Sequence, residues 1–232
     1  ILDELGEKNL GKPRGIYITI ESPKLKNSDQ ELKDEMSKVL AKEIKALGMN
    51  DENTKTLIVG LGNWNVTPDA LGPKVIDRVL VTRQFFIAYK KDSDETVANV
   101  SALSPGVMGL TGIETGEIIK GIVEKTKPDL VIAIDALASR RMERVNTTIQ
   151  LSDTGINPGA GIGNKRLGLN EEFLGVPVLS IGVPTVVDAA TMVNATMDLI
   201  IGTMQEPADV GTEFYGMLEG ISNEDKYTLI KE

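Results

Sequence analysis

The stretch that decides the fold of this chain is Thr56-Leu-Ile-Val-Gly-Leu61, a short apolar run with β-branched residues. Such a run, bounded by turn residues, predicts a strand buried on both faces of a parallel sheet. Irregular sequence follows from Gly62 to Gly72, and Pro73 is suited to begin a helix that would continue through Leu80. We therefore expect Asp69 in a loop just ahead of a helix N-terminus.

The same pattern recurs along the rest of the chain. Leu130–Ile134 predicts a second buried strand, which delivers Asp135 at its C-terminal end, and Val176–Val183 predicts a third. Shorter strand candidates cover 15–21, 85–89, 97–103 and 147–151, and helices are expected over 114–125 and about 186–201. Strands that alternate with helices predict an α/β fold with a mainly parallel, twisted sheet and helices on both faces.

A further helix is expected behind Ser28-Asp-Gln-Glu31, which matches a capping box with Ser28 as the N-cap. Its apolar residues fall on one face as far as Leu47, and Gly48 is expected to end it. With 232 residues, the chain is predicted to form one domain over 1–232, with an uncertain connection at 199–213. No run reaches the ~18 apolar residues of a membrane span, so no membrane association is expected.

The chain contains no His and no Cys. This excludes disulfides, a thiolate nucleophile, the usual zinc ligands and a Ser-His-Asp triad, so a general acid or base must be Asp, Glu, Lys or Tyr. We expect no metal and no cofactor. The net charge of −9 comes without a basic stripe, which argues against direct binding of nucleic acid.

Asp69 and Asp135 are the best candidates for catalysis, because each follows a buried strand on what should be one edge of the sheet. Two facing carboxyl groups can share a proton and act as base and acid. The helix dipole favours the charged form of Asp69, which makes it the base, whereas desolvation should raise the pKa of Asp135, the acid. On spacing alone, an Asp after a strand is more often a cap or a turn former.

Weaker candidates surround this pair. Arg140 and Arg141 could bind an acidic substrate side chain or simply pair with surface acids. Asp188 is equally consistent with a binding role and with a favourable position early in a helix. The glycines of the 153–164 loop, among them Gly159 and Gly161, could shape a loop that binds a peptide or an oxyanion, or a plain flexible connection.

Four segments of the chain are long and specific: Leu57-Ile-Val-Gly-Leu-Gly-Asn-Trp-Asn-Val-Thr-Pro-Asp-Ala-Leu-Gly-Pro73, Val131-Ile-Ala-Ile-Asp-Ala-Leu-Ala138, Gly155-Ile-Asn-Pro-Gly-Ala-Gly-Ile-Gly-Asn164 and Gly182-Val-Pro-Thr-Val-Val-Asp188. With them, the chain resembles the germination protease (spore protease) family over roughly residues 11–198. The resemblance implies that Asp69 and Asp135 are the two essential aspartates of an atypical aspartic protease. It also implies that the chain as given is incomplete at both ends.

The resemblance further implies an endopeptidase that cleaves small acid-soluble spore proteins after a Glu during germination. It would be made as a zymogen, assemble as a homotetramer and act in the cytoplasm of the spore core. The fold looks similar to that of hydrogenase maturation endopeptidases, but those bind a metal with the help of a His that this chain lacks. The alternative is a ligand-binding or phosphorylase-like α/β module without peptidase activity.

Overall fold

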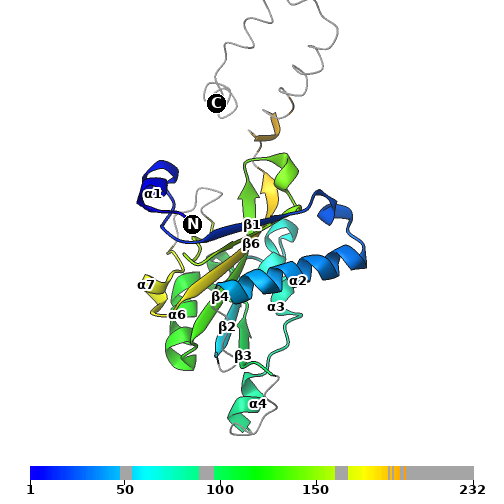
Figure 1. The fold of residues 1–232 in the computed structure, drawn as a ribbon. Helices are drawn as coiled ribbons and strands as arrows, with labels where there is room; N and C mark the ends of the chain where they lie inside the picture. Colours follow the sequence, from blue (N-terminus) through cyan, green and yellow to red (C-terminus); the bar gives the residue numbers. More distant parts are fainter. Residues whose placement is uncertain are drawn as a thin grey trace, which may run out of the picture.

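A single mixed sheet organises the computed structural model of the chain, in the strand order β1-β5-β6-β4-β2-β3 (Figure 1). The structure describes residues 1–47, 54–88, 97–159 and 167–187, together with residues 189, 191–193 and 196. The strands are β1 Tyr17–Glu21, β2 Thr56–Gly60, β3 Val100–Leu103, β4 Leu130–Ser139, β5 Thr148–Ser152 and β6 Val178–Val187.

The strands β3, β2, β4 and β6 run parallel to one another, whereas β5 is antiparallel to both of its neighbours, β6 and β1. The expected α/β fold with a mainly parallel sheet is therefore confirmed. The antiparallel edge arises because β5 returns from the end of β4 after a short connection, which is too short for a parallel crossover.

Helices cover both faces of the sheet. They are α1 Glu4–Leu10, α2 Gln30–Ala46, α3 Leu71–Ile76, α4 Arg83–Ala88, α5 Met108–Thr111, α6 Thr115–Thr126 and α7 Glu171–Leu174; η1 Pro23–Asn27, η2 Thr67–Asp69 and η3 Met142–Arg144 are 3₁₀ turns. Ile119 and Val123 of α6 pack on one face with Val131 of β4, while Leu40 and Ile44 of α2 pack over the other.

The alternation along β4 explains why both faces need cover. Val131 and Ala133 belong to the core beneath α6, and Ile132 between them belongs to the core beneath α2. Successive side chains of a strand point to opposite faces, so a continuous apolar run fits only a strand that is covered twice. Each buried aliphatic side chain contributes about 1.5–3 kcal/mol relative to an exposed one.

The prediction of a strand over 85–89 is wrong for residues 85–88, which belong to the helix α4. Thr82 is tied to β3, with its N–H donating to Val100 O at 2.9 Å and its Oγ1 accepting from Val100 N at 2.9 Å. Phe85 N then donates to Thr82 O, and the chain turns into a helix. Phe85 and Ile87 are 48% and 62% exposed, and among the described residues neither pairs with a strand.

Three element ends also differ from expectation. The N-cap of α2 is Asp29, whose side chain accepts from Leu32 N, rather than Ser28. The helix α3 begins at Leu71, ahead of Pro73, and ends at Ile76. Since β6 runs to Val187, the helix expected from about 186 begins later. Residues 189, 191–193 and 196 are helical, while Gly48 and the connection at 199–213 lie outside the described residues.

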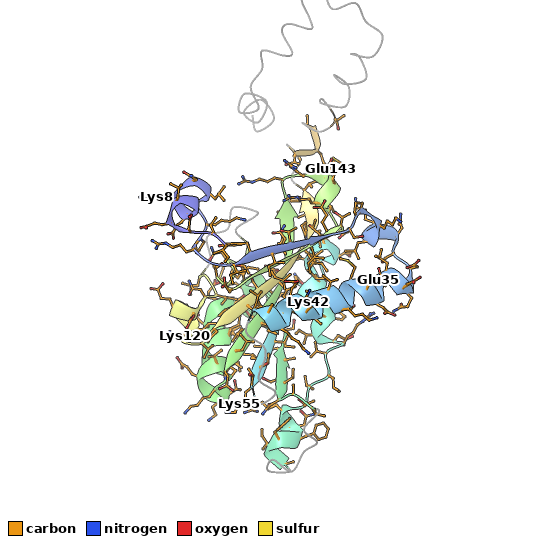
Figure 2. The ribbon with its side chains drawn as sticks, viewed as in Figure 1. Lys8, Glu35, Lys42, Lys55, Lys120 and Glu143 are labelled. Carbon is orange, nitrogen blue, oxygen red and sulfur yellow. The ribbon has the colours of Figure 1, made fainter. Side chains whose placement is uncertain are left out.

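Charged side chains lie around the outside of this arrangement, as Figure 2 shows for Lys8 on α1, Glu35 and Lys42 on α2, and Lys120 on α6. Lys120 Nζ lies over the Phe173 ring, 4.9 Å from its centre, in a cation–π contact between α6 and α7. In the part of the chain that the structure describes, no helix is long and apolar enough to cross a membrane.

Candidate active site

The unequal lengths of the parallel strands create a step at one edge of the sheet. The last pair that β2 makes with β4 is Gly60 opposite Ile134, after which Leu61 N donates to Ile134 O at 2.8 Å. Beyond it, β4 continues without β2 but stays paired with β6 in what we call the β4–β6 ribbon, in which Asp135 pairs with Gly182. On its other side, Gly182 still pairs with Gln150 of β5. Asp135 is thus the first residue of β4 past the end of β2.

Asp135 is 6% exposed, although it is a charged residue type. Its Oδ1 accepts a hydrogen bond from the N–H of the next residue, Ala136, at 2.8 Å. A carboxyl group that loses most of its contact with water is costly to charge unless it is hydrogen-bonded. Asp135 is therefore a buried carboxyl group that a backbone N–H supports.

Asp69 lies across from it, in the 3₁₀ turn η2. The N–H of Asn63 donates to Asp69 Oδ2 at 2.8 Å and to the backbone O of Asp69 at 3.1 Å, and Asp69 N donates to Val66 O at 2.8 Å. The loop thus folds back on itself and holds the carboxyl group in place. The predicted position ahead of a helix is confirmed, since α3 begins two residues later.

Glycines allow this loop to fold so tightly. Gly62 has φ +110°, and a Cβ there would lie 2.0 Å from the backbone O of Asp69. A Cβ on Gly72 would lie 2.2 Å from Leu61 O, so α3 contacts the end of β2 directly. The glycines of Gly60-Leu-Gly62 therefore serve close packing and the placement of Asp69.

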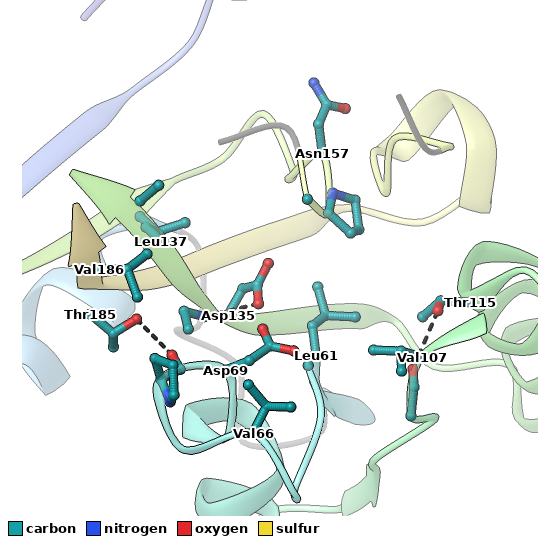
Figure 3. Close-up of a pocket in the computed structure, with 17 residues that line it drawn as sticks. Leu61, Val66, Asp69, Val107, Thr115, Asp135, Leu137, Asn157, Thr185 and Val186 are labelled. Atoms are coloured by element: carbon teal, nitrogen blue, oxygen red, sulfur yellow. Dashed lines mark hydrogen bonds between the residues drawn. The ribbon is translucent and has the colours of Figure 1, made fainter. Parts of the chain in front are cut away.

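A cavity of about 440 Å³ opens between these elements, and both carboxyl groups line it. Figure 3 shows the side chains of Asp69 and Asp135 pointing toward one another in it. The walls are mostly apolar and come from four strand ends and the loops behind them: Leu61, Gly62, Val66, Pro68, Gly106, Val107, Thr115, Ala136, Leu137, Ala138, Asn157, Pro158, Gly159, Thr185 and Val186. Asp69 and Asp135 are the ionisable residues among the lining residues that the structure describes.

The loop after β5 reaches the cavity with Asn157, Pro158 and Gly159. Its base is closed by a pair of backbone hydrogen bonds between Ile156 and Leu169, of 3.0 and 2.8 Å. Gly159 has φ +72°, a backbone conformation that favours glycine. The predicted participation of Gly159 is therefore consistent with its position, while Gly161 lies outside the described residues.

The structure does not place Arg140 and Arg141 on the cavity wall. The strand β4 continues to Ser139, four residues beyond Asp135, which is roughly 13 Å at ~3.3 Å per residue. Both arginines follow that point and are exposed. Asp188 lies outside the described residues, although Val186, two positions before it, lines the cavity.

Sequence reasoning missed several residues that shape the site. Asn63 holds Asp69 through its backbone N–H, which no side-chain motif could indicate. Val107 lies between β3 and α6, and Thr115 is the first residue of α6; the sequence predicts a helix over 114–125 but no contact of either residue with the site. Thr185 donates from Oγ1 to the carbonyl of Pro68 at 2.7 Å, and this contact depends on the pairing of β6 with β4.

Comparison with known proteins adds an independent finding. A family model described as germination protease matches residues 1–211. The chain is 52% identical over its full length to a germination protease of Clostridium tetani and 53% identical to one of Caldanaerobacter subterraneus subsp. tengcongensis, and covers 72% of each. It is also 53% identical to a germination protease of Bacillus mycoides over 204 residues, which are 86% of this chain and 55% of that protein.

Proposed function

Because this chain belongs to the germination protease family and is a peptide-bond hydrolase, we propose that Asp69 and Asp135 carry out the hydrolysis. The observation that supports this most strongly is that the two carboxyl groups face one another in one cavity. They come from positions 66 residues apart and from different elements, η2 and β4. Peptide hydrolysis requires a base for the attacking water and an acid for the departing amine, and a pair of carboxyl groups provides both.

We assign Asp69 as the base and Asp135 as the acid. The hydrogen bond from Asn63 N to Asp69 Oδ2 favours the charged carboxylate, which accepts the proton of the attacking water. For Asp135 we propose that burial outweighs the one hydrogen bond from Ala136 N and favours the protonated form, which donates a proton to the amine nitrogen as the peptide bond breaks. If the two groups share one proton, the titration belongs to the pair rather than to either residue.

As the substrates we propose small acid-soluble spore proteins, cleaved on the carboxyl side of a Glu when the spore germinates. The name of the family, germination protease, supports a role in germination, and the substrates and the cleavage site are proposed from the resemblance described above. The setting would then be the cytoplasm of the spore core, with an enzyme made as a zymogen and assembled as a homotetramer. The apolar walls of the cavity suit an aliphatic or aromatic substrate side chain next to the reacting bond.

The architecture supports one further comparison within this proposal. The candidate site lies at the carboxyl ends of parallel strands. We propose that the fold is similar to that of hydrogenase maturation endopeptidases. Such a likeness concerns the fold, because function depends on the site built upon it. The carboxyl pair of this chain would then perform the chemistry by acid–base catalysis.

The proposal is tested with the variants Asp69→Asn and Asp135→Asn, which keep the shape of each side chain and remove its proton chemistry. Incubation with a small acid-soluble spore protein, followed by analysis of the fragments, should show a loss of rate of about 10²–10⁴-fold for each. The double variant should be little worse than either single one, because the two groups act as a unit.

A matched control is Asp77→Asn, which changes an exposed Asp at the end of α3 that does not line the cavity. This variant should cleave at the normal rate, and all variants should unfold at temperatures close to that of the parent protein. A folded Asp69→Asn or Asp135→Asn protein that keeps about a tenth of its activity would remove that residue from the mechanism. Absence of fragments with the parent protein would favour the ligand-binding alternative.

A further inference from the structure

We propose that Thr185 is a positioning residue for catalysis, because its hydroxyl ties the turn that carries Asp69 to the end of strand β6. This role rests on the proposed function, since it presupposes that Asp69 takes part in hydrolysis. Thr185 lines the same cavity as the two aspartates, and Figure 3 shows its hydrogen bond beside Asp69.

An irregularity of the sheet gives Thr185 this direction. The pairing of β4 with β6 is regular up to Leu137 opposite Pro184, and it resumes with Ala138 opposite Val186. Thr185 is therefore an extra residue on β6, a β-bulge. A bulge redirects a side chain that would otherwise follow the alternation of the strand, and here the side chain points across to η2.

The bond that results joins distant parts of the chain. Thr185 Oγ1 donates to the backbone O of Pro68 at 2.7 Å, and Pro68 directly precedes Asp69. The bonds from Asn63 N to Asp69 and from Asp69 N to Val66 O hold the loop in its own shape. They fix the carboxyl group relative to the loop, whereas the Thr185 bond fixes the loop relative to the β4–β6 ribbon that carries Asp135.

The separation of the two carboxyl groups then depends on this contact. A displacement of about 1 Å at a reacting group can lower a catalytic rate by ~10²-fold. Because Thr185 does not carry the proton, its loss should lower kcat and leave substrate binding, as reflected in KM, nearly unchanged. Val has nearly the shape of Thr, with a second methyl group in place of the hydroxyl, so Thr185→Val tests the hydroxyl by itself.

The experiment compares Thr185→Val, which lacks the hydroxyl, with Thr185→Ser, which keeps it. The matched control is Thr126→Val in α6, which removes a hydroxyl that also donates to a backbone carbonyl at 2.7 Å, away from the cavity. With a small acid-soluble spore protein as the substrate, we expect Thr185→Val to lower kcat by about tenfold to a hundredfold, with KM within about twofold. Thr185→Ser and Thr126→Val should keep at least about half of the parent kcat.

A second measurement reports the loop without any catalysis. Trp64 is the single tryptophan of the chain and lies in the same loop as Asp69, where it is 52% exposed. Its fluorescence quenching by acrylamide should increase in Thr185→Val and stay at the parent level in Thr185→Ser and Thr126→Val. If Thr185→Val does not fold, Thr185→Ala against Thr185→Ser makes the same comparison.

The results separate this proposal from the proposed function. Parent-like kcat and Trp64 quenching in Thr185→Val would overturn the positioning role, even if Asp69→Asn is inactive. An equal loss in Thr185→Ser, or in Thr126→Val, would also overturn it, because the loss would then not come from this hydroxyl. If Asp69→Asn stays active while Thr185→Val shows altered quenching and a lower kcat, the role of Asp69 fails and that of Thr185 in holding the loop stands.

Discussion

At the scale of single residues, the internal shape of the loop that carries Asp69 depends mainly on backbone groups. Asn63 contributes its N–H, Val66 its carbonyl and Gly62 the space beside the Asp69 carbonyl. A different side chain at Asn63 or Val66 would leave these backbone bonds in place, whereas a side chain added at Gly62 would collide with the Asp69 carbonyl. The loop is therefore most sensitive to substitution at its glycine.

We predict that Gly62→Ala lowers both stability and activity. A Cβ would lie 2.0 Å from the Asp69 carbonyl, and φ +110° is a conformation that Ala rarely adopts, so the loop must shift. The cost should be about 1–3 kcal/mol in the free energy of unfolding, with a loss of rate of about tenfold or more as Asp69 moves. Chemical denaturation and fragment analysis measure the two effects.

The control for this prediction is Gly121→Ala. Gly121 lies in the helix α6, and a Cβ there would meet nothing within 4 Å. Ala is the better helix former, so this variant should gain about 0.5–1 kcal/mol and keep its activity. A Gly62→Ala protein as stable and active as Gly121→Ala would contradict the account of the loop.

A second prediction at this scale concerns Arg140 and Arg141, for which we propose recognition of the substrate Glu. Both are exposed and lie beyond the cavity wall, so contact with the substrate would occur along the β4–β6 ribbon. Replacement by Ala should reduce kcat/KM for a Glu substrate by more than about tenfold, mainly through KM, because a guanidinium pairs with a carboxylate in two hydrogen bonds. If kcat/KM falls equally for a substrate with Gln in place of that Glu, neither arginine recognises the charge of the Glu side chain.

At the scale of elements, the N-cap of α2 is Asp29, one residue later than the capping-box pattern of the sequence predicts. Asp29 is the N-cap and accepts from Leu32 N at 2.9 Å, while Ser28 ends the preceding turn η1. Asp29→Ala should therefore cost about 1 kcal/mol in the free energy of unfolding, whereas Ser28→Ala should be nearly neutral. Denaturation midpoints of the two variants decide between the residues, and the reverse order would restore Ser28 as the cap.

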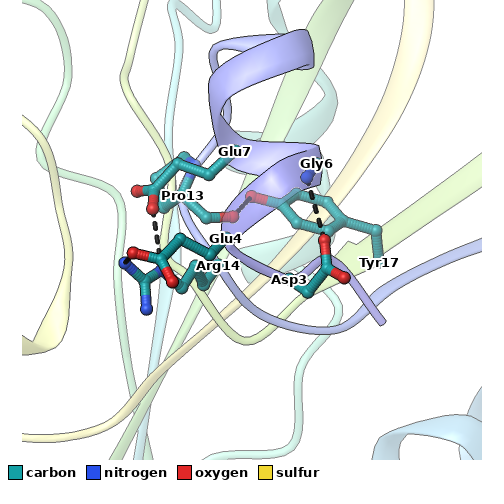
Figure 4. Close-up of polar contacts among 7 residues, drawn as sticks. All are labelled: Asp3, Glu4, Gly6, Glu7, Pro13, Arg14 and Tyr17. Atoms are coloured by element: carbon teal, nitrogen blue, oxygen red, sulfur yellow. Dashed lines mark hydrogen bonds and ion pairs between the residues drawn. The ribbon is translucent and has the colours of Figure 1, made fainter.

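The N-terminal segment is held mainly by strand pairing. Arg14 forms ion pairs with Glu4 and Glu7, with N–O distances of 3.3 and 2.8 Å, and Tyr17 donates to the carbonyl of Pro13. Figure 4 shows these residues beside one another. These ion pairs are largely exposed, and exposed pairs contribute about 0–1 kcal/mol. The antiparallel pairing of β1 with β5 is therefore the main contact that places this segment on the sheet.

At the scale of the whole molecule, the net charge of −9 bears on whether the protein binds DNA. The lysines labelled in Figure 2 lie on separate elements around the molecule rather than in one stripe. Binding to duplex DNA gains affinity from phosphate contacts with clustered Lys and Arg. We predict no submicromolar affinity for duplex DNA at physiological salt, measured by fluorescence anisotropy; a tighter complex would contradict this reading of the surface.

The sequence by itself determined the buried strands, because Thr56–Leu61 and Leu130–Ile134 are apolar runs that only a doubly covered sheet can accommodate. It also indicated Asp69 and Asp135 as a pair, since both follow such strands and parallel strands end at one edge. The structure brings those two side chains to one cavity. The strands and the common location of the two aspartates could be predicted because they depend on local pattern and on strand direction alone, whereas the catalytic role of the pair stays a proposal.

Only the tertiary structure decided the rest. Residues 85–88 form a helix although they are a continuous apolar run, and within the described residues it is Thr82 rather than this run that bonds to the edge of β3. The extra residue Thr185 and its bond to Pro68 depend on the register between β4 and β6, and Arg140 is kept from the cavity by the length of β4. Register, strand length and edge occupancy arise between segments far apart in the chain, so no local pattern contains them.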